Sequence, residues 1–388
     1  MSDSGKKISI LGALVLTLSF LLLSFAEYGP NRVLTGTNIG ARELFGNGFF
    51  LLIFLSITII VLIITNHKKY KLMVGLASLL MMGLVLYLFG TAIVKETFNI
   101  ISNGRISLGI GFWSIFLGME MVMNGCLKGD KKCILYRRLF YTILILMILI
   151  FLLSGHLDNL SIMKEFFNRS STFFRQIRRH FSLSIFSVIA GLILGIPTGV
   201  IIYKEKKMEG PILFIINLGQ TIPTLSLLGI IMVPLTLLSQ QNKFLKDIGI
   251  SGVGFAPAFI VLVIYALFPV VHNTIAGLKM IDQDLLETAA GLGMKANQIF
   301  WKIQLPLSLP IILGGIRIAI TQSIGNTILA GLIGGGGLGS IIFLGLAQAA
   351  PDLILLGVIP LIAMAFIMDS VISFFIFFYK KRYLGLAE

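Results

Sequence analysis

Charged residues are scarce in this chain. Asp, Glu, Lys and Arg make up 12% of its 388 residues, whereas soluble domains carry roughly 25%. The mean hydropathy is +0.97, and 56% of the residues are hydrophobic. This composition excludes a soluble globular protein and predicts a polytopic membrane protein.

Cysteine and histidine are also scarce, which argues against metal and redox sites. The two cysteines lack C-x-x-C spacing, so we expect reduced thiols. The histidines form no H-E-x-x-H motif, and we expect no metal site. A membrane enzyme would need clustered acids, histidines or cysteines near the interface, so no catalytic residue is predicted either. The residues concerned are Cys126, Cys133, His67, His156, His180 and His272.

A lysine-containing phosphate loop is absent as well. The glycine-rich run GLIGGGGLGS at 331–340 lacks the lysine of the GxxxxGK[ST] motif and follows no strand. We expect this run to form a flexible, tightly packed extracellular turn, because glycine tolerates backbone conformations that other residues avoid.

Long apolar runs are what the chain does contain. A bilayer-spanning helix needs roughly 20 apolar residues. We count ten such segments and predict an all-α fold with about ten transmembrane helices. They lie at about 8–26, 48–65, 72–94, 107–127, 139–153, 181–203, 211–238, 256–275, 307–330 and 353–378.

The basic residues indicate the orientation of these spans. With the N-terminus inside, 19 of the 31 Lys and Arg residues fall in cytoplasmic segments and 11 fall outside. Cytoplasmic loops carry the excess of Lys and Arg in membrane proteins. We therefore expect a multi-pass protein of the cell (inner) membrane with both termini cytoplasmic, and we read the net charge of +14 as a membrane signal rather than a nucleic-acid signal.

A polar connector at Ser154–His180 divides the chain. Its run FFNRSSTFFRQIRRHF alternates aromatic residues with arginines, which predicts an interfacial amphipathic helix leading into the next span. We expect an N-terminal membrane extension of about five spans at 1–165 and a second domain at 170–385. Glu120, the notable acid of the first block, is expected to be structural.

Two spans of the second block carry polar side chains at membrane depth. They suit a translocation pathway, but interhelical hydrogen bonding explains them equally well. Arg317 needs a partner or water at this depth, and Asp369 is a candidate by charge. The candidate pathway residues are Asn217, Gln220, Thr221, Pro223, Thr224, Thr321, Gln322 and Asn326.

A dense polar stretch at Asp282–Pro306 lies on the predicted cytoplasmic side. Acidic residues in a first turn favour a short helix over about 282–290, which the glycines at 291 and 293 end. A second short helix is expected over about 295–304, ending at Pro306. A helix–glycine–helix element is not needed to connect two spans, so we interpret it as a docking surface.

This stretch resembles the EAA signature of binding-protein-dependent ABC importer permeases. That signature is E-A-A, three residues, G, nine residues, I, any residue, L-P, and Thr288 is the one departure from it here. The resemblance implies a MetI-like permease core of five helices at 170–385, with its coupling loop at 282–306. The matching residues are Glu287, Ala289, Gly293, Ile303, Leu305 and Pro306.

Further runs are similar to the permeases of osmoprotectant importers, which carry glycine betaine, choline, carnitine and related quaternary ammonium compounds. They are NLGQTIPTLSLLGIIMVPL at 217–235 and GVGFAPAFIVLVIYALFPVVHNT at 252–274. YGPNR at 28–32 and LSIMKEF at 160–166 resemble the long-form permeases of the YehY type.

The resemblance implies a transport subunit rather than an enzyme. A separate cytoplasmic ATPase would bind ATP and drive alternating access through the coupling loop, so this chain is expected to hold no cofactor. An extracytoplasmic substrate-binding protein and a second permease subunit, identical or different, are the other expected partners. A permease for an amino acid or another amine is the alternative, and a secondary transporter is a more distant one.

Overall fold

The structure is a computed structural model that describes residues 3–29, 36–65, 70–94, 104–126, 133–247, 249–383 and 385. The chain separates into an N-terminal unit, Met1–Asn168, and a C-terminal unit, Arg169–Glu388. Helices dominate both units, and the predicted all-α membrane fold class is confirmed. His67 and the basic residues at 66–69 and 127–132 lie outside the described residues, as does the side chain of Cys133.

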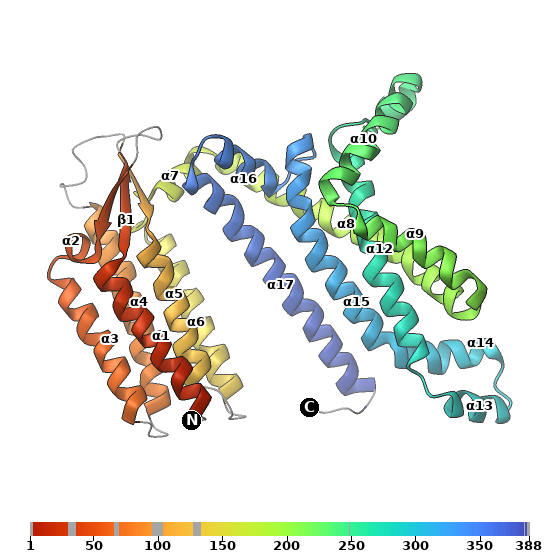
Figure 1. Ribbon diagram of the computed structural model, residues 1–388, viewed down its shortest axis with the longest axis horizontal. Coiled ribbons are helices and arrows are strands. Elements are labelled where there is room, and N and C mark those ends of the chain that lie inside the picture. Colours follow the sequence, from red (N-terminus) through yellow and green to blue (C-terminus); the bar gives the residue numbers. More distant parts are fainter. Residues whose placement is uncertain are drawn as a thin grey trace. The chain divides into compact units, whose positions relative to one another are not determined.

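The N-terminal unit is a helical bundle whose helices follow the predicted apolar segments closely. Phe20, Leu52, Met81 and Ile115 are among its fully buried side chains, while other apolar side chains stay exposed on the outer faces, as lipid contact requires. The helices are α1 (Asp3–Leu22), α2 (Ala41–Phe45), α3 (Gly48–Thr65), α4 (Tyr70–Val94), α5 (Ile110–Cys126), α6 (Cys133–Leu153) and α7 (Ser161–Asn168) (Figure 1).

A small antiparallel sheet, absent from the prediction, joins the bundle at the end opposite the N-terminus (Figure 1). Its strands are β1 (Ser24–Gly29), β2 (Thr37–Gly40) and β3 (Arg105–Leu108), in the order β2-β1-β3. Tyr28 pairs with Thr37 on one side and with Ile106 on the other. Central β1 therefore ties the connection after α1 to the residues that precede α5.

Two carboxylates of this unit have structural partners. Glu165 on α7 is buried and pairs with Arg105 of β3 at 2.7 Å, which fastens α7 to the sheet. Glu120 on α5 accepts hydrogen bonds from the Asn124 amide and the Tyr141 hydroxyl, so the expected structural role is confirmed.

The C-terminal unit contains the longest helices. Pro351 begins the helix that ends near the C-terminus, and α13 and α14 lie at that same end of the unit, with α16 at the opposite end (Figure 1). The helices are α8 (Ser170–Lys204), η2 (Lys206–Met208), α9 (Glu209–Thr221), α10 (Thr224–Gln241), α11 (Lys243–Asp247), α12 (Phe255–Lys279), α13 (Gln283–Gly291), α14 (Ala296–Ile299), η3 (Phe300–Gln304), α15 (Leu305–Asn326), η4 (Thr327–Ile333), α16 (Leu338–Ala347) and α17 (Pro351–Tyr383).

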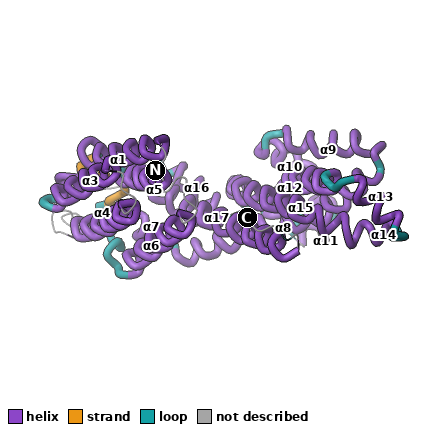
Figure 2. Tube along the Cα trace, turned by 90° about the horizontal axis from the view of Figure 1, so that it is seen from below, coloured by secondary structure: helices purple, strands orange, loops and turns teal. Residues whose placement is uncertain are grey.

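Helices α8, α12 and α15 pack against one another and form the centre of this unit (Figure 2). Gly191, Gly195 and Gly199 repeat every fourth residue on α8 and face α12. A Cβ added at Gly191 would come within 2.7 Å of the Ala266 Cβ atom. The glycine repeat therefore permits close approach of two membrane helices, as small residues do in lipid.

The glycine-rich turn between η4 and α16 is held by side chains from the first turns of α8. The backbone N–H of Gly337 donates to Gln176 Oε1 at 2.7 Å, and Arg179 Nε donates to the Gly335 carbonyl at 3.1 Å. Because His180 Nδ1 accepts from the Leu338 N–H, its Nε2 carries the proton and donates to the Ile324 carbonyl. We call Gln176, Arg179 and His180 the α8 latch.

This turn is tightly packed, as predicted. Gly334, Gly336 and Gly337 adopt positive φ values of 75°, 82° and 89°, which favour glycine. A Cβ at Gly339 would lie 1.8 Å from the Ile328 carbonyl oxygen. A larger residue at Gly339 is therefore excluded sterically.

The described part of the chain contains eight helices long and apolar enough to cross a membrane, so the predicted count of ten is not confirmed. Helix α5 and the described apolar part of α6 are shorter than this limit. The predicted single span at 211–238 is wrong, because extended Ile222 and Pro223 divide it into α9 and α10. Arg169 divides the run that was predicted to form an interfacial helix. The residues before Arg169 belong to α7, and those from Ser170 onward form the start of α8, which continues without a break into the next span.

Candidate functional site

The helix–glycine–helix element at 282–306 is built from defined helix-end motifs. The Asp282 carboxylate caps α13 by accepting from the Asp284 N–H. At the other end of α13, Gly293 has a φ of +83°, its N–H donates to the Ala290 carbonyl, and the Met294 N–H donates to the Ala289 carbonyl. This is a Schellman motif, in which glycine takes the left-handed position because it lacks a Cβ.

The second half of the element corrects a prediction. We expected a helix that stops at Pro306, but α14 passes through the π-helical turn η3 into α15, so the helix is continuous from Ala296 to Ile333. The Leu305 N–H donates to the Phe300 carbonyl five residues earlier. This wider turn removes the clash between the proline ring and the α-helical carbonyl that would otherwise break the helix.

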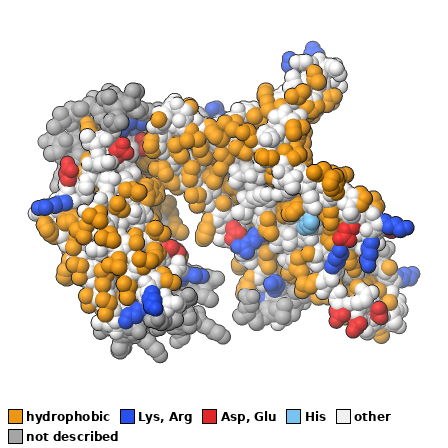
Figure 3. All heavy atoms as spheres, viewed as in Figure 1, with side chains coloured by type: hydrophobic (Ala, Val, Ile, Leu, Met, Phe, Trp, Pro, Cys, Tyr) orange, Lys and Arg blue, Asp and Glu red, His pale blue; other side chains and the backbone are white. Residues whose placement is uncertain are grey.

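The signature residues divide into an exposed and a packed set. Glu287 and Gly293 are exposed, whereas Ala289 is buried at 4% exposure. Ile303, Leu305 and Pro306 are half-buried where the element joins α15. Acidic side chains gather over α13 (Figure 3). Leu292 is 80% exposed and Trp301 65% exposed, so an apolar surface lies beside the acidic one.

Contacts of Gln304 and Phe300 connect this element to α8. Beside the element, Lys279 at the end of α12 pairs with Glu209 at the start of α9, the Nζ–Oε1 distance being 2.7 Å. Gln304 Nε2 donates to the Tyr203 hydroxyl of α8 at 3.1 Å, and the Lys204 ammonium lies 5.0 Å from the Phe300 ring centre. Displacement of the element would therefore pull on α8 directly.

Helix α17 donates a hydrogen bond to the same element. The acceptor is a backbone carbonyl that has no donor within its own helix, because a proline lies four residues later. Pro310 has no N–H to donate to the Pro306 carbonyl four residues earlier. The Tyr379 hydroxyl of α17 donates to that carbonyl at 3.1 Å instead. In lipid, freed carbonyls need such partners, so this bond fastens α17 to the start of α15.

The predicted pathway residues of α9 bind α12 instead of lining an open space. Pro269 leaves the Tyr265 carbonyl without its α-helical donor, and Gln220 Nε2 donates to that carbonyl at 3.2 Å. Asn217 Oδ1 lies 3.1 Å from His272 Nε2. These contacts correspond to the second interpretation of these side chains, interhelical hydrogen bonding.

The remaining candidates near the α9–α10 break have separate environments. Thr221 is exposed and donates to the Leu218 carbonyl of its own helix, and extended Pro223 precedes α10. Thr224 and Asn326 line a narrow cavity together with apolar residues of α10 and α12. The role of these residues in a translocation pathway stays a prediction.

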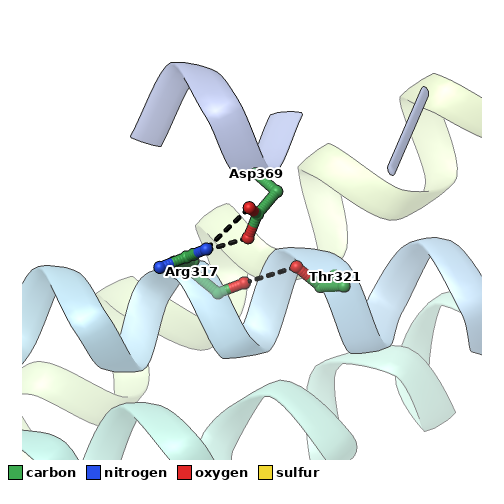
Figure 4. A network of polar contacts seen from close by, with 3 residues as sticks. All are labelled: Arg317, Thr321 and Asp369. Atoms are coloured by element: carbon green, nitrogen blue, oxygen red, sulfur yellow. Dashed lines mark hydrogen bonds and ion pairs between the residues drawn. The ribbon is translucent and has the colours of Figure 1, made fainter. Parts of the chain in front are cut away.

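A wider opening lies between α12, α15 and α17. Thr321 and Gln322 line a hollow of about 640 Å³ together with Asn273, Arg317 and Asp369. We call this space the polar hollow. Arg317 Nε and Nη2 donate to the two Asp369 carboxylate oxygens at 2.5 and 2.6 Å, which confirms the suspected partner (Figure 4). Thr321 donates to the Arg317 carbonyl at 2.9 Å.

Sequence reasoning missed a hydroxyl network between α8 and the end of α15 with the start of η4. Ser184 Oγ lies 3.0 Å from Thr327 Oγ1, and Ser187 Oγ lies 3.0 Å from Ser323 Oγ. Ser184 and Ser187 are three residues apart and Ser323 and Thr327 are four apart, so each pair lies on one helical face, and this spacing was the available signal. Asn273 and His272 were missed although they stand with Thr274 as a short polar run within apolar α12.

Comparison with protein families bears on both units. Residues 187–383 match the family model "Binding-protein-dependent transport system inner membrane component". The chain belongs to this family. Residues 6–163 match a second model, "ABC transporter permease YehY, N-terminal domain", so both parts of the predicted resemblance are confirmed.

Individual relatives match about half of this family member. The choline transport system permease protein OpuBB of Bacillus subtilis (strain 168) is 35% identical over 194 residues, covering 50% of this chain and 82% of that protein. The glycine betaine/carnitine/choline transport system permease protein OpuCB of the same organism has the same values. The osmoprotectant import permease protein OsmW of Salmonella typhimurium is 33% identical over 191 residues, or 49% of this chain and 84% of that protein.

A solved structure of the MetNI methionine ABC transporter, in an inward-facing conformation, shares 19% identity with a TM-score of 0.47. The match covers 53% of this chain and 95% of the chain in the solved structure. This likeness is too low to bear on function.

Proposed function

We propose that the chain imports glycine betaine or a related quaternary ammonium osmoprotectant as a permease subunit of an ABC importer. The relatives named for choline, glycine betaine and carnitine transport support this substrate class. The permease family membership supports the transport role. An amino acid or another amine remains the alternative substrate.

The observation that carries the mechanism is the exposed, motif-defined turn at Gly293. In the proposed mechanism, α13 and α14 dock into a cytoplasmic ATPase, with Glu287 on the acidic surface and Leu292 and Trp301 on the apolar one. ATP binding in that partner displaces the element. The bonds at Tyr203 and Tyr379 then pass the displacement to α8 and α17.

The proposal includes further partners and an orientation. A second permease subunit completes the pathway, an extracytoplasmic binding protein delivers substrate, and ATP is bound by the ATPase, so this chain needs no cofactor of its own. Both termini and the element at 282–306 lie in the cytoplasm. The basic residues of the predicted cytoplasmic segments support this orientation.

Uptake by the complete transporter tests the proposed function. The chain is co-expressed with its ATPase and binding-protein partners in cells that lack osmoprotectant uptake. We expect accumulation of radiolabelled glycine betaine, choline or carnitine, and no accumulation when the ATPase partner is made inactive. Uptake confined to an amino acid would reject the substrate class, and uptake that persists without ATP hydrolysis would reject the importer mechanism.

A further inference from the structure

We propose that the polar hollow is a binding subsite for zwitterionic quaternary ammonium compounds, in which Arg317 pairs with the ligand carboxylate and Asp369 with its ammonium group. The proposal rests on the proposed function and narrows its substrate class. It selects zwitterions such as glycine betaine over cations such as choline.

The first argument is the position of the ion pair. Arg317 and Asp369 occupy the middle of α15 and α17, where a charge is costly unless it faces protein or water. Their side chains are nevertheless 45% and 33% exposed. Asn273, Thr321 and Gln322 add polar groups around the pair. The two charges are therefore accessible from the hollow and are not enclosed by the unit.

The second argument concerns the volume of the hollow and the replacement of the Arg317–Asp369 ion pair by a ligand. A volume of about 640 Å³ falls within the roughly 300–1,000 Å³ of typical small-molecule sites. Ion pairs with this much exposure contribute little net stability, because water competes for both charges. A ligand that carries the same two charges can replace the pair without leaving either side chain unpaired.

The third argument is charge balance. The Arg317–Asp369 pair is neutral as a whole, and a zwitterion keeps the hollow neutral when it inserts between the two side chains. Choline would satisfy Asp369 alone and leave the guanidinium unpaired beside a second positive charge, which is unfavourable at membrane depth. Arginine also binds carboxylates through parallel hydrogen bonds, and this favours ligands with a carboxylate.

The competing explanation is a purely structural clamp between α15 and α17. The double variant R317Q/D369N separates the two, because Gln and Asn can still hydrogen-bond across the helices but carry no charge. If the pair is only a clamp, the ligand should still protect the hollow from labelling in this variant. A zwitterion subsite predicts that this protection disappears while the protein stays folded, as judged by its thermal unfolding and its assembly with partners.

Thiol labelling measures occupancy without depending on transport. In the complete transporter in lipid nanodiscs, with Cys126 and Cys133 replaced by Ala, T321C places a reporter in the hollow. A small charged thiol reagent labels it if the hollow is wet. S154C is the control, because Ser154 is also exposed and bonded to a nearby backbone carbonyl, but lies in the N-terminal unit, outside both the hollow and the element at 282–306.

We expect glycine betaine to slow labelling of T321C at least fivefold, and choline at the same concentration to slow it less than twofold. Labelling of S154C should not change, and protection of T321C should be lost in R317Q/D369N. Equal protection by both ligands, protection that persists in the double variant, or a T321C thiol that never reacts would each overturn the subsite. If wild-type uptake of quaternary ammonium compounds succeeds in those cases, the proposed function stands without it.

Discussion

At the scale of single residues, the backbone conformation at position 293 favours glycine. Its φ of +83° lies in the region that residues with a Cβ avoid, although a Cβ there would meet nothing within 4 Å. The requirement is therefore conformational and not steric. This separates Gly293 from Gly339, whose neighbours exclude any side chain.

We predict that Gly293→Val uncouples transport while membrane insertion stays normal. The left-handed conformation costs roughly 1–2 kcal/mol for a residue with a Cβ, so the Schellman turn should open and misplace α14. Substrate uptake by the assembled transporter measures the effect, with an expected loss of at least tenfold. Gly291→Val is the matched control, because Gly291 is equally open but belongs to the helix α13. Normal uptake by Gly293→Val would count heavily against the docking role.

At the scale of elements, proline-containing helices depend on donors from their neighbours. Pro269 and Pro310 each leave a carbonyl unpaired within their own helix, and Gln220 and Tyr379 donate to those carbonyls from α9 and α17. As a result, α12 depends on α9, and α15 depends on α17, for the donor of one hydrogen bond each.

The Tyr379 bond can be tested by restoring the missing donor. Tyr379→Phe should lower the free energy of unfolding by about 1 kcal/mol, because the Pro306 carbonyl loses its partner. Pro310→Ala supplies a backbone N–H for that carbonyl, so Tyr379→Phe should cost markedly less in this background. Thermal unfolding of the four proteins in a double-mutant cycle measures the difference, and Tyr383→Phe on the same helix serves as control. An unchanged cost in the Pro310→Ala background would contradict the argument.

The elements also show what sequence reasoning can reach. Apolar length predicted most helices, and the resemblance to the EAA signature located the element around Gly293, because both are local signals. The sequence analysis misplaced the end at Pro306, since the rule for proline assumes α-helical bonding and η3 is a π-turn. It missed the pairing of Tyr28 with Ile106 because the two residues lie far apart in the chain. It left two interpretations of Gln220 open because the donors on α9 and the carbonyls on α12 that they reach are not visible together in a sequence.

At the scale of the whole molecule, the sequence contains the EAA-like element at 282–306 and no GxxxxGK[ST] motif. Its glycine-rich run at 331–340 is instead a packed turn held by the α8 latch. In the part of the chain that the structure describes, no group of three or more His, Cys, Asp or Glu residues lies close enough to hold a metal ion. The proposed division of labour between permease and ATPase rests on the family membership.

We predict that the purified chain alone hydrolyses no ATP. Addition of the ATPase partner should confer hydrolysis, and substrate-loaded binding protein should stimulate it further. Phosphate release in nanodiscs measures both steps, with the ATPase partner alone as the reference. Turnover by the chain without its partner would reject the assignment as a transport subunit.

The α8 latch also constrains how the protein is made. Gln176 and the Gly337 N–H that it binds are 161 residues apart in the chain. At a synthesis rate of about 5–20 residues per second, α8 leaves the ribosome roughly 8–32 s before its partner turn exists. During this interval the polar groups of Gln176, Arg179 and His180 must remain solvated at the membrane surface. The latch is therefore a late step of biogenesis, and it closes only after the glycine-rich turn has been inserted.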